Sequence, residues 1–120
     1  MAANSTIATS KKGKCSLGRP WNAQHRSVYL NTYLDATILP AGYTKWSTNP
    51  LTANYNNYTV MAEYKSEGPG FDLAGRIEGN ITIEFDANQA RTYRTPKDVF
   101  MTSDGMQPNY AWIDSQAYTW

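Results

Sequence analysis

The sequence has few of the aliphatic residues that build protein cores. Leu, Ile, Val and Phe together account for 18 of the 120 residues, or 15%, below the roughly 20% that separates core-forming chains from disordered ones. Such a deficit accompanies disorder when the net charge is high, but 11 basic residues here face 10 acidic ones, for a net charge of +1. The composition therefore predicts an ordered chain of one domain's length with a thin core of its own.

Cysteine and histidine are each present once. Cys15 excludes an internal disulfide and leaves open a cytosolic thiol or a partner cysteine outside this chain. His25 has no nucleophilic Ser or Cys motif near it, which argues against a hydrolase triad and favours a surface histidine in a turn. The scattered carboxylates show no metal-ligand spacing. We therefore expect neither a metal nor a cofactor.

Signals for nucleic acid and membranes are also missing. The only basic cluster, Lys11, Lys12 and Lys14, lies in a Ser/Thr/Gly context that is typical of a solvated loop, so we expect no nucleic-acid partner. No apolar run approaches the roughly 20 residues of a membrane helix, and the N-terminus has no apolar signal-peptide stretch. These absences predict a chain that does not insert into membranes.

Three Asn-x-Ser/Thr triplets favour the secretory pathway, whereas the lone cysteine is also compatible with the cytosol. They begin at Asn4, Asn57 and Asn80, and each could accept a glycan in the secretory pathway. A chain this rich in Asn and Thr will contain one or two such triplets by chance. The triplets are therefore candidate glycosylation sites only.

What is present is a surplus of aromatic residues and a pattern of short strands. Nine Tyr, four Trp and three Phe supply flat, polar-tipped surfaces that suit contact with sugars. Alternation predicts strands at 27–33, 43–46, 58–64 and 76–85, with a shorter β-prone stretch at 5–9. Short strands separated by turns exclude a doubly wound α/β fold and leave a sandwich, a barrel or a β-solenoid.

The C-terminal part changes character. Asp86 and Gln89 have the spacing of a capping box, which predicts a short helix over about 87–93. Thr95 followed by Pro96 repeats a helix start signal and predicts a second short helix ending near Met101. We therefore expect a tail with two short helices.

The most informative segment is Leu17-Gly-Arg-Pro-Trp21. Gly18 permits a tight backbone and Pro20 fixes φ, so Arg19 and Trp21 are presented rigidly beside one another. A guanidinium can hold a carboxylate through two parallel hydrogen bonds, and an indole can stack on a sugar ring. The alternative is an arginine paired with a surface acid and a tryptophan in the core.

This segment resembles the closing signature of the pectin methylesterases, carbohydrate esterases that hydrolyse methyl esters of polygalacturonate. Further segments are similar to that family's C-terminal region in the same order, and in style to its fungal members: His25–Tyr29, Ile38–Gly42, Trp46, Ala62–Gly70 and Arg76. The resemblance covers about residues 13–80 well and the tail to Trp120 more loosely. It implies an all-β, right-handed parallel β-helix of the single-stranded, pectin-lyase-like type. Residues 1–85 would form C-terminal coils and loops of the catalytic domain, and residues 86–120 a tail with short helices.

The resemblance also implies roles for two residues. Arg19 would hold the nucleophilic aspartate, and Trp21 would pack against a galacturonate ring. In the family, one aspartate attacks the ester, a second acts as acid and base, and glutamines stabilise the oxyanion; these groups lie upstream in motifs resembling Gln-Asp-Thr-Leu and Asp-Phe-Ile-Phe-Gly. Neither motif occurs here, and the aspartates of this chain stand in other contexts, namely Asp35, Asp72, Asp86, Asp98, Asp104 and Asp114. Because a missing nucleophile removes several orders of magnitude in rate, we expect the isolated chain to be inactive or nearly so.

Two functions remain open. The first is the C-terminal part of a secreted pectinesterase acting on pectin outside the cell or in the cell wall, monomeric when complete, with its signal peptide outside this chain. The second is a non-catalytic pectin-binding or scaffold protein built from the same coils. They differ in whether segments with the catalytic aspartates are encoded upstream of Met1.

Overall fold

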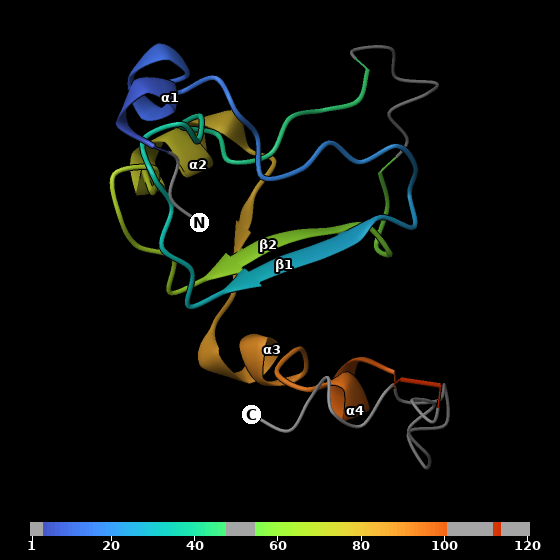
Figure 1. The fold of residues 1–120 in the computed structure, drawn as a ribbon. Coiled ribbons are helices and arrows are strands. Elements are labelled where there is room, and N and C mark those ends of the chain that lie inside the picture. The colour runs from blue at the N-terminus through green and yellow to red at the C-terminus, as the bar shows by residue number, and fades with distance from the viewer. Residues whose placement is uncertain (1–3, 48–54, 101–111, 114–120) are drawn as a thin grey trace. The chain divides into compact units, whose positions relative to one another are not determined.

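The computed structural model describes residues 4–47, 55–100 and 112–113, which belong to two compact units, 1–84 and 85–120 (Figure 1). The first unit contains helix α1 (Ser5–Ser10), strands β1 (Arg26–Leu30) and β2 (Val60–Tyr64), helix α2 (Leu73–Gly79) and strand β3 (Ile83–Glu84). The second contains helices α3 (Ala87–Arg91) and α4 (Pro96–Val99). No helix in the described part of the chain is long and apolar enough to cross a membrane.

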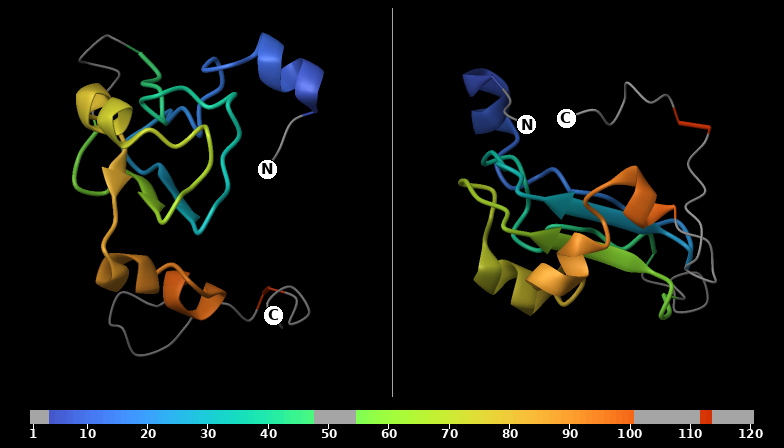
Figure 2. Two further views of the ribbon diagram at one scale, coloured as in Figure 1. Left: turned by 90° about the vertical axis from the view of Figure 1, so that its left-hand side faces the viewer. Right: turned by 90° about the horizontal axis from the view of Figure 1, so that it is seen from below.

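The first unit is organised by a parallel sheet in the order β1-β2-β3. Arg26 pairs with Val60, and Ala62 pairs with Ile83. Figures 1 and 2 show β1 and β2 side by side and pointing the same way. Because parallel neighbours cannot be joined by a tight hairpin, the chain makes a long excursion between each pair of strands.

Parallel pairing continues beyond the strands. Tyr33 forms a parallel bridge with Glu67, and Cys15 forms one with Ile38. The Leu39 amide donates to the Cys15 carbonyl at 2.8 Å, so these irregular segments also follow one another in register. Successive passes of the chain are thus laid beside one another in the same direction.

The core of the first unit is small and partly aromatic. Leu17, Leu34, Tyr43 and Met61 form the buried cluster, and partly buried side chains pack around it, namely Tyr29, Ile38, Tyr55, Phe71 and Ile81. The hydroxyl of Tyr43 donates to the Ser27 carbonyl at 3.0 Å, and burial raises the pKa of Tyr43 to about 12. Tyr43 therefore fills a core position that an aliphatic side chain usually occupies, with its hydroxyl satisfied by a hydrogen bond.

Two predicted strands are confirmed with shifted ends. The strand expected at 27–33 is β1, and the strand expected at 58–64 is β2. Both ladders end where the backbone enters the left-handed region, at Asn31 (φ 49°) after β1 and Lys65 (φ 50°) after β2. The alternation predicted the strands, but their ends depend on these bends.

Two other strand predictions are wrong, and a third, at 76–85, is confirmed only for its last part. The stretch at 5–9 lies in α1, because the Asn4 side chain accepts from the Ile7 amide and caps a helix. The stretch at 43–46 forms no strand and consists of bends at its two ends with irregular backbone between them. The first four residues of 76–85 belong to α2, which Asp72 caps and Asn80 ends in a left-handed conformation, and only β3 within that range is strand. Since α2 lies between β2 and β3, helices are not confined to the tail, contrary to the all-β prediction.

The start signals of the tail helices are confirmed in the second unit. Asp86 accepts from the Gln89 amide while the Gln89 side chain accepts from the Asp86 amide, which completes the predicted capping box of α3. Thr95 caps α4, and Pro96 occupies its first turn. The predicted end near Met101 falls outside the described residues. The helices are shorter than predicted.

Candidate functional site

The segment 17–21 is held along its backbone by the segment 42–46. The Leu17 amide donates to the Gly42 carbonyl at 2.8 Å, and the Thr44 amide donates to the Gly18 carbonyl at 3.1 Å. Pro20 is fully buried between two exposed neighbours, Arg19 and Trp21. The proline therefore anchors the loop while the two flanking side chains project outward, as the sequence predicts.

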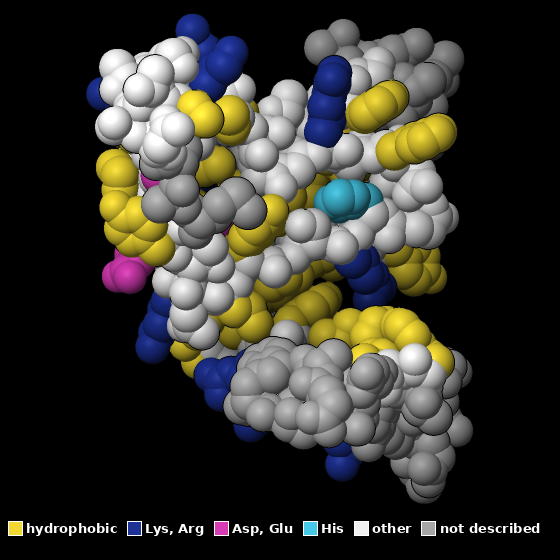
Figure 3. All heavy atoms as spheres, in the orientation of Figure 1, with side chains coloured by type: hydrophobic (Ala, Val, Ile, Leu, Met, Phe, Trp, Pro, Cys, Tyr) yellow, Lys and Arg dark blue, Asp and Glu magenta, His cyan; other side chains and the backbone are white. Residues whose placement is uncertain are grey.

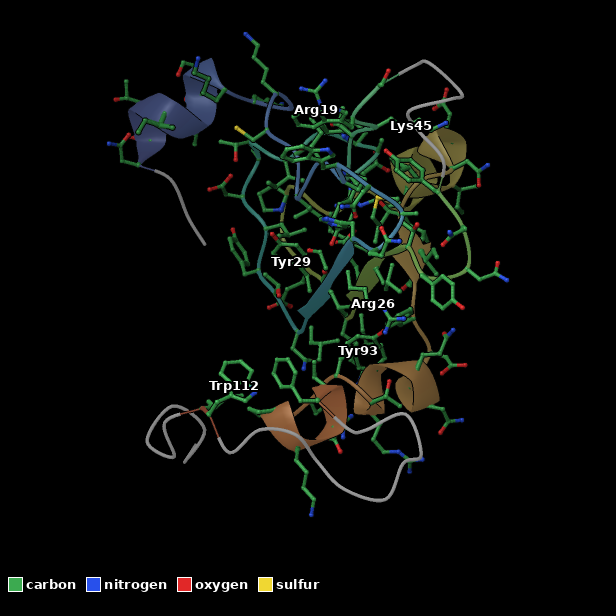
Figure 4. All side chains as sticks on the ribbon, turned by 90° about the vertical axis from the view of Figure 1, so that its right-hand side faces the viewer. Arg19, Arg26, Tyr29, Lys45, Tyr93 and Trp112 are labelled. Atoms are coloured by element: carbon green, nitrogen blue, oxygen red, sulfur yellow. The ribbon has the colours of Figure 1, made fainter. Side chains whose placement is uncertain are left out.

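Arg19 is fixed by backbone carbonyls and an aromatic ring. Its Nε donates to the Lys45 carbonyl at 3.3 Å, and its Nη2 donates to the Trp46 carbonyl at 3.0 Å. The guanidinium carbon lies 5.0 Å from the centroid of the Trp46 ring, in cation–π geometry. Figure 4 shows Arg19 and Lys45 together at one end of the first unit. The alternative of a surface acid as partner is not seen among the described residues, where the one ion pair lies elsewhere.

Trp21 and Trp46 form an exposed pair of stacked indoles. Their ring centroids are 5.9 Å apart and their planes differ by 9°. Trp21 is 73% exposed and Trp46 is 45% exposed. A tryptophan in the core is thus excluded for Trp21, and an uncovered flat apolar surface of this kind suits the C–H face of a sugar ring.

Tyr55 ties the two sides of the site together. Its hydroxyl accepts from the Trp46 amide at 3.1 Å and donates to the Pro20 carbonyl at 3.4 Å. Sequence reasoning treated Tyr55 as part of a turn-rich stretch and gave Trp46 no role beyond the resemblance. Nothing local in the sequence signals these contacts, because they join residues from three separate passes of the chain.

Gly18 and His25 lie directly behind the loop. A Cβ on Gly18 would lie 3.0 Å from the Tyr43 ring, so a side chain at this position would require that ring to shift by a few tenths of an ångström. The Nε2 of His25 is buried without a hydrogen-bond partner among the described residues, and it would lie 3.9 Å from that same Cβ. His25 as a whole is partly exposed, and its amide donates to the Asn22 carbonyl across a turn, so only this nitrogen departs from the prediction of a surface histidine in a turn.

A buried ion pair lies beside Gly42, where a Cβ would come 2.7 Å from Arg76 Nε. Arg76 donates from Nε to Glu63 Oε2 at 2.6 Å, and both side chains are at most 4% exposed. The other guanidinium N–H groups donate to Glu63 Oε1 and to three backbone carbonyls, of Leu39, Pro40 and Gly70. All five donors thus have acceptors. The pair also borders a pocket of about 450 Å³ that Phe71, Leu73 and Ile77 help to line.

The described aspartates have local structural roles. Asp35 accepts from the amide and hydroxyl of Thr37, and Asp98 accepts from the Thr95 hydroxyl. Asp72 and Asp86 cap helices. Asp104 and Asp114 lie outside the described residues. Within that same part of the chain, no three His, Cys, Asp or Glu side chains come together as a metal site.

The three candidate glycan acceptors all lie on the surface. Asn57 is exposed in the turn before β2, whereas Asn4 and Asn80 are exposed at the caps of α1 and α2. In the view of Figure 3, apolar and uncharged polar side chains cover much of the first unit, and acidic side chains are few.

Comparison with known proteins identifies the family. The model of the pectinesterase family matches residues 1–104. Pectinesterase 2 of Citrus sinensis is 42% identical over 65 residues, 54% of this chain and 12% of that protein. Putative pectinesterase 11 of Arabidopsis thaliana is 31% identical over 96 residues, 80% of this chain and 25% of that protein. A pectinesterase of Petunia integrifolia is 35% identical over 71 residues, 59% of this chain and 18% of that protein.

The chain thus spans a quarter or less of the length of these relatives. No solved structure matches it. The expected similarity to fungal members is not borne out, because these relatives are plant proteins. With the family model covering most of its residues, the chain belongs to the pectinesterase family.

Proposed function

We propose that the chain is the C-terminal part of a pectin methylesterase, which hydrolyses methyl esters of polygalacturonate to pectate and methanol. The observation that carries this proposal is the site itself: a guanidinium fixed by the carbonyls of Lys45 and Trp46, beside an exposed pair of indoles. Membership of the pectinesterase family supplies the reaction class.

In this proposal the fold is one end of a right-handed parallel β-helix. Residues 1–85 would supply coils and loops, and residues 86–120 a helical tail. The parallel order β1-β2-β3 and the parallel bridge of Cys15 with Ile38 support it, since both lay successive passes of the chain in one direction. Coils of such a solenoid bury their faces against neighbouring coils, which accounts for the thin core.

The proposed roles of the site residues follow from their geometry. Two of the five N–H donors of Arg19 bind carbonyls of the described residues, which fixes the plane of the guanidinium. The remaining donors would hold the nucleophilic aspartate in its ionised, attacking form. Trp21 would stack on a galacturonate ring, and Trp46 would support Trp21 from behind.

The test uses a longer protein that contains the aspartate motifs upstream of this chain. Arg19→Ala should lower methanol release from methyl-esterified pectin by about two orders of magnitude or more while leaving the unfolding transition in place. Arg26→Ala is the matched control, because Arg26 also donates to a backbone carbonyl, that of Tyr58, but outside this site. Near wild-type turnover in Arg19→Ala would reject the proposed role.

A non-catalytic pectin-binding or scaffold protein is the second candidate. The exposed indole pair favours it, because stacking on sugar needs no aspartate. Sequencing the transcript upstream of Met1 separates the two: aspartate motifs in the same frame support the esterase, whereas a complete frame beginning at Met1 supports the scaffold.

The proposal includes secretion to the cell exterior or cell wall and glycosylation at Asn4, Asn57 and Asn80, whose exposure is compatible with attached glycans. Expression through a eukaryotic secretory pathway, followed by glycosidase treatment and mass measurement, tests each site. An unchanged mass on treatment would contradict the glycosylation. Pectin is the one partner proposed, with the complete enzyme as a monomer and no cofactor.

A further inference from the structure

The segment 41–46 holds the residues of the candidate site in place. Its Gly42 carbonyl and Thr44 amide hold the backbone of Leu17 and Gly18, and its Lys45 and Trp46 carbonyls hold Arg19. Trp46 also supplies one half of the indole pair. The position of the site therefore depends on whatever fixes this segment to the rest of the unit.

Thr82, just before β3, fixes the start of that segment. Its Oγ1 donates to the Ala41 carbonyl at 2.5 Å and accepts from the Tyr43 amide at 3.2 Å. A hydroxyl has one proton to donate, so the side chain joins the two peptide units on either side of Gly42 in a single arrangement. The side chain thus acts as a clip on the turn.

Gly42 explains why the clip is needed. It has φ +77°, a conformation available to glycine with little cost, and a Cβ there would lie 2.6 Å from Thr82 Oγ1. A glycine in a turn can also adopt other conformations, so the sequence of the turn does not by itself fix it. The hydroxyl of Thr82 lies directly against Gly42 and adds to the two backbone hydrogen bonds that Gly42 makes with Leu17 and Leu39.

We propose that Thr82 is a positioning residue for the site formed by Arg19, Trp21 and Trp46. It touches none of these side chains and acts through residues 41–46. If Thr82 positions the two indoles, it should also affect sugar binding. That effect on sugar binding rests on the proposed function, whereas the positioning of the two indoles does not.

The test compares Thr82→Val with Thr82→Ser in the 120-residue chain. Valine keeps the shape and removes both hydrogen bonds, whereas serine keeps the hydroxyl. The indole N–H resonances of Trp21 and Trp46, assigned by their Phe variants, report the stack, because each ring shifts the signals of the other. We expect Thr82→Val to move both resonances toward unstacked values and Thr82→Ser to restore them. Thr32→Val is the control, since the Thr32 hydroxyl donates to the Leu30 carbonyl, away from the site.

A second readout is binding of methyl-esterified oligogalacturonate. Thr82→Val should weaken the affinity about tenfold, as expected for loss of hydrogen bonds that hold a site in shape, and Thr82→Ser should recover it. If the wild-type chain binds no oligogalacturonate but the resonances respond as expected, the sugar-binding role of this chain fails, the positioning role stands, and the proposed function is judged separately by Arg19→Ala in the longer protein.

Three results would overturn the positioning role. One is a Thr82→Val chain with wild-type indole resonances, and another is a wild-type chain whose indoles show no stacking. If Thr82→Val does not fold, the smaller Thr82→Ala, which leaves space for water near the carbonyl, replaces it. Loss of all dispersed resonances together in both variants would then show a general role in stability instead.

Discussion

The hydrogen bonds of Glu63 and Arg76 join four parts of the first unit. The carboxylate comes from β2 and the guanidinium from α2, and the carbonyls come from two loops, at Leu39–Pro40 and at Gly70. Taking two charges out of water costs several kcal/mol per ion, and this cost is offset only where every hydrogen-bonding group has a partner, as here. Removing one partner of the pair should therefore destabilise the fold by much more than the intact pair stabilises it.

Glu63→Ala should destabilise the chain by about 3–5 kcal/mol, because it leaves the guanidinium buried without its counter-charge. Urea unfolding followed by circular dichroism measures the difference. Glu78→Ala, at an exposed position of α2 outside this network, should change the free energy of unfolding by about 0.5 kcal/mol or less. Equal losses in both variants would contradict a special cost for the buried pair.

Tyr43 should make the free energy of unfolding fall as the pH rises into the alkaline range. Burial raises its pKa from 10.0 to about 12, so the folded chain keeps the phenol proton while the unfolded chain loses it. The stabilisation is fully present below pH 10 and is lost as the pH rises to about 12, with a maximum of roughly 3 kcal/mol. The wild-type chain should lose more stability than Tyr43→Phe over this range in urea unfolding. Parallel losses in the two proteins would show that another group is responsible.

The exposed presentation of Arg19 and Trp21 could be predicted from five adjacent residues, because Gly18 and Pro20 constrain the backbone locally, whereas their roles come from the family resemblance and stay predictions. Their surroundings could not. Trp46, Tyr55 and Thr82 reach the site from later passes of the chain, and the buried pair of Glu63 and Arg76 depends on the same stacking. Contacts of this kind leave no periodic signal in the sequence.

Among the helices and strands, local capping and alternation decided which predictions succeeded. The capping box at Asp86 and the alternation around β2 are complete within a few residues, so both elements were predicted. The segment of α2 was assigned to a strand because Ile81 and Ile83 alternate just beyond it. The cap at Asp72 and the burial of Arg76 outweigh that alternation and place a helix before a very short strand.

The cap of α2 can be tested directly. Asp72 accepts from the Gly75 amide at 3.1 Å, and Asp72→Ala should cost about 1 kcal/mol because that amide loses its acceptor. Asp72→Asn is the matched control, since an asparagine oxygen can accept the same bond. The midpoint of urea unfolding should fall for alanine and stay near wild type for asparagine. If both variants fall together, the charge rather than the cap stabilises the helix.

The first unit as a whole leaves an apolar face of α2 uncovered among the described residues. Leu73 and Ile77, one helical turn apart, are 46% and 71% exposed beside the pocket near Arg76. Exposed apolar patches favour association in water. The isolated chain should therefore self-associate as its concentration rises, and Ile77→Lys should reduce this in sedimentation velocity. Ile7→Lys, at an exposed position on α1, should not. A wild-type chain that stays monomeric at high concentration would contradict the expectation.

The all-parallel sheet has a consequence for how the chain acquires its structure. Neither ladder among the described strands of the first unit can begin from a local hairpin: Arg26 meets its partner only when Val60 has been brought back beside it, and Ala62 must likewise wait for Ile83. Every pairing therefore loses the entropy of closing a long loop before it gains a hydrogen bond, which makes folding slow. On a ribosome, β1 must remain an unpaired edge until β2 has emerged, and during that interval it is open to pairing with other chains.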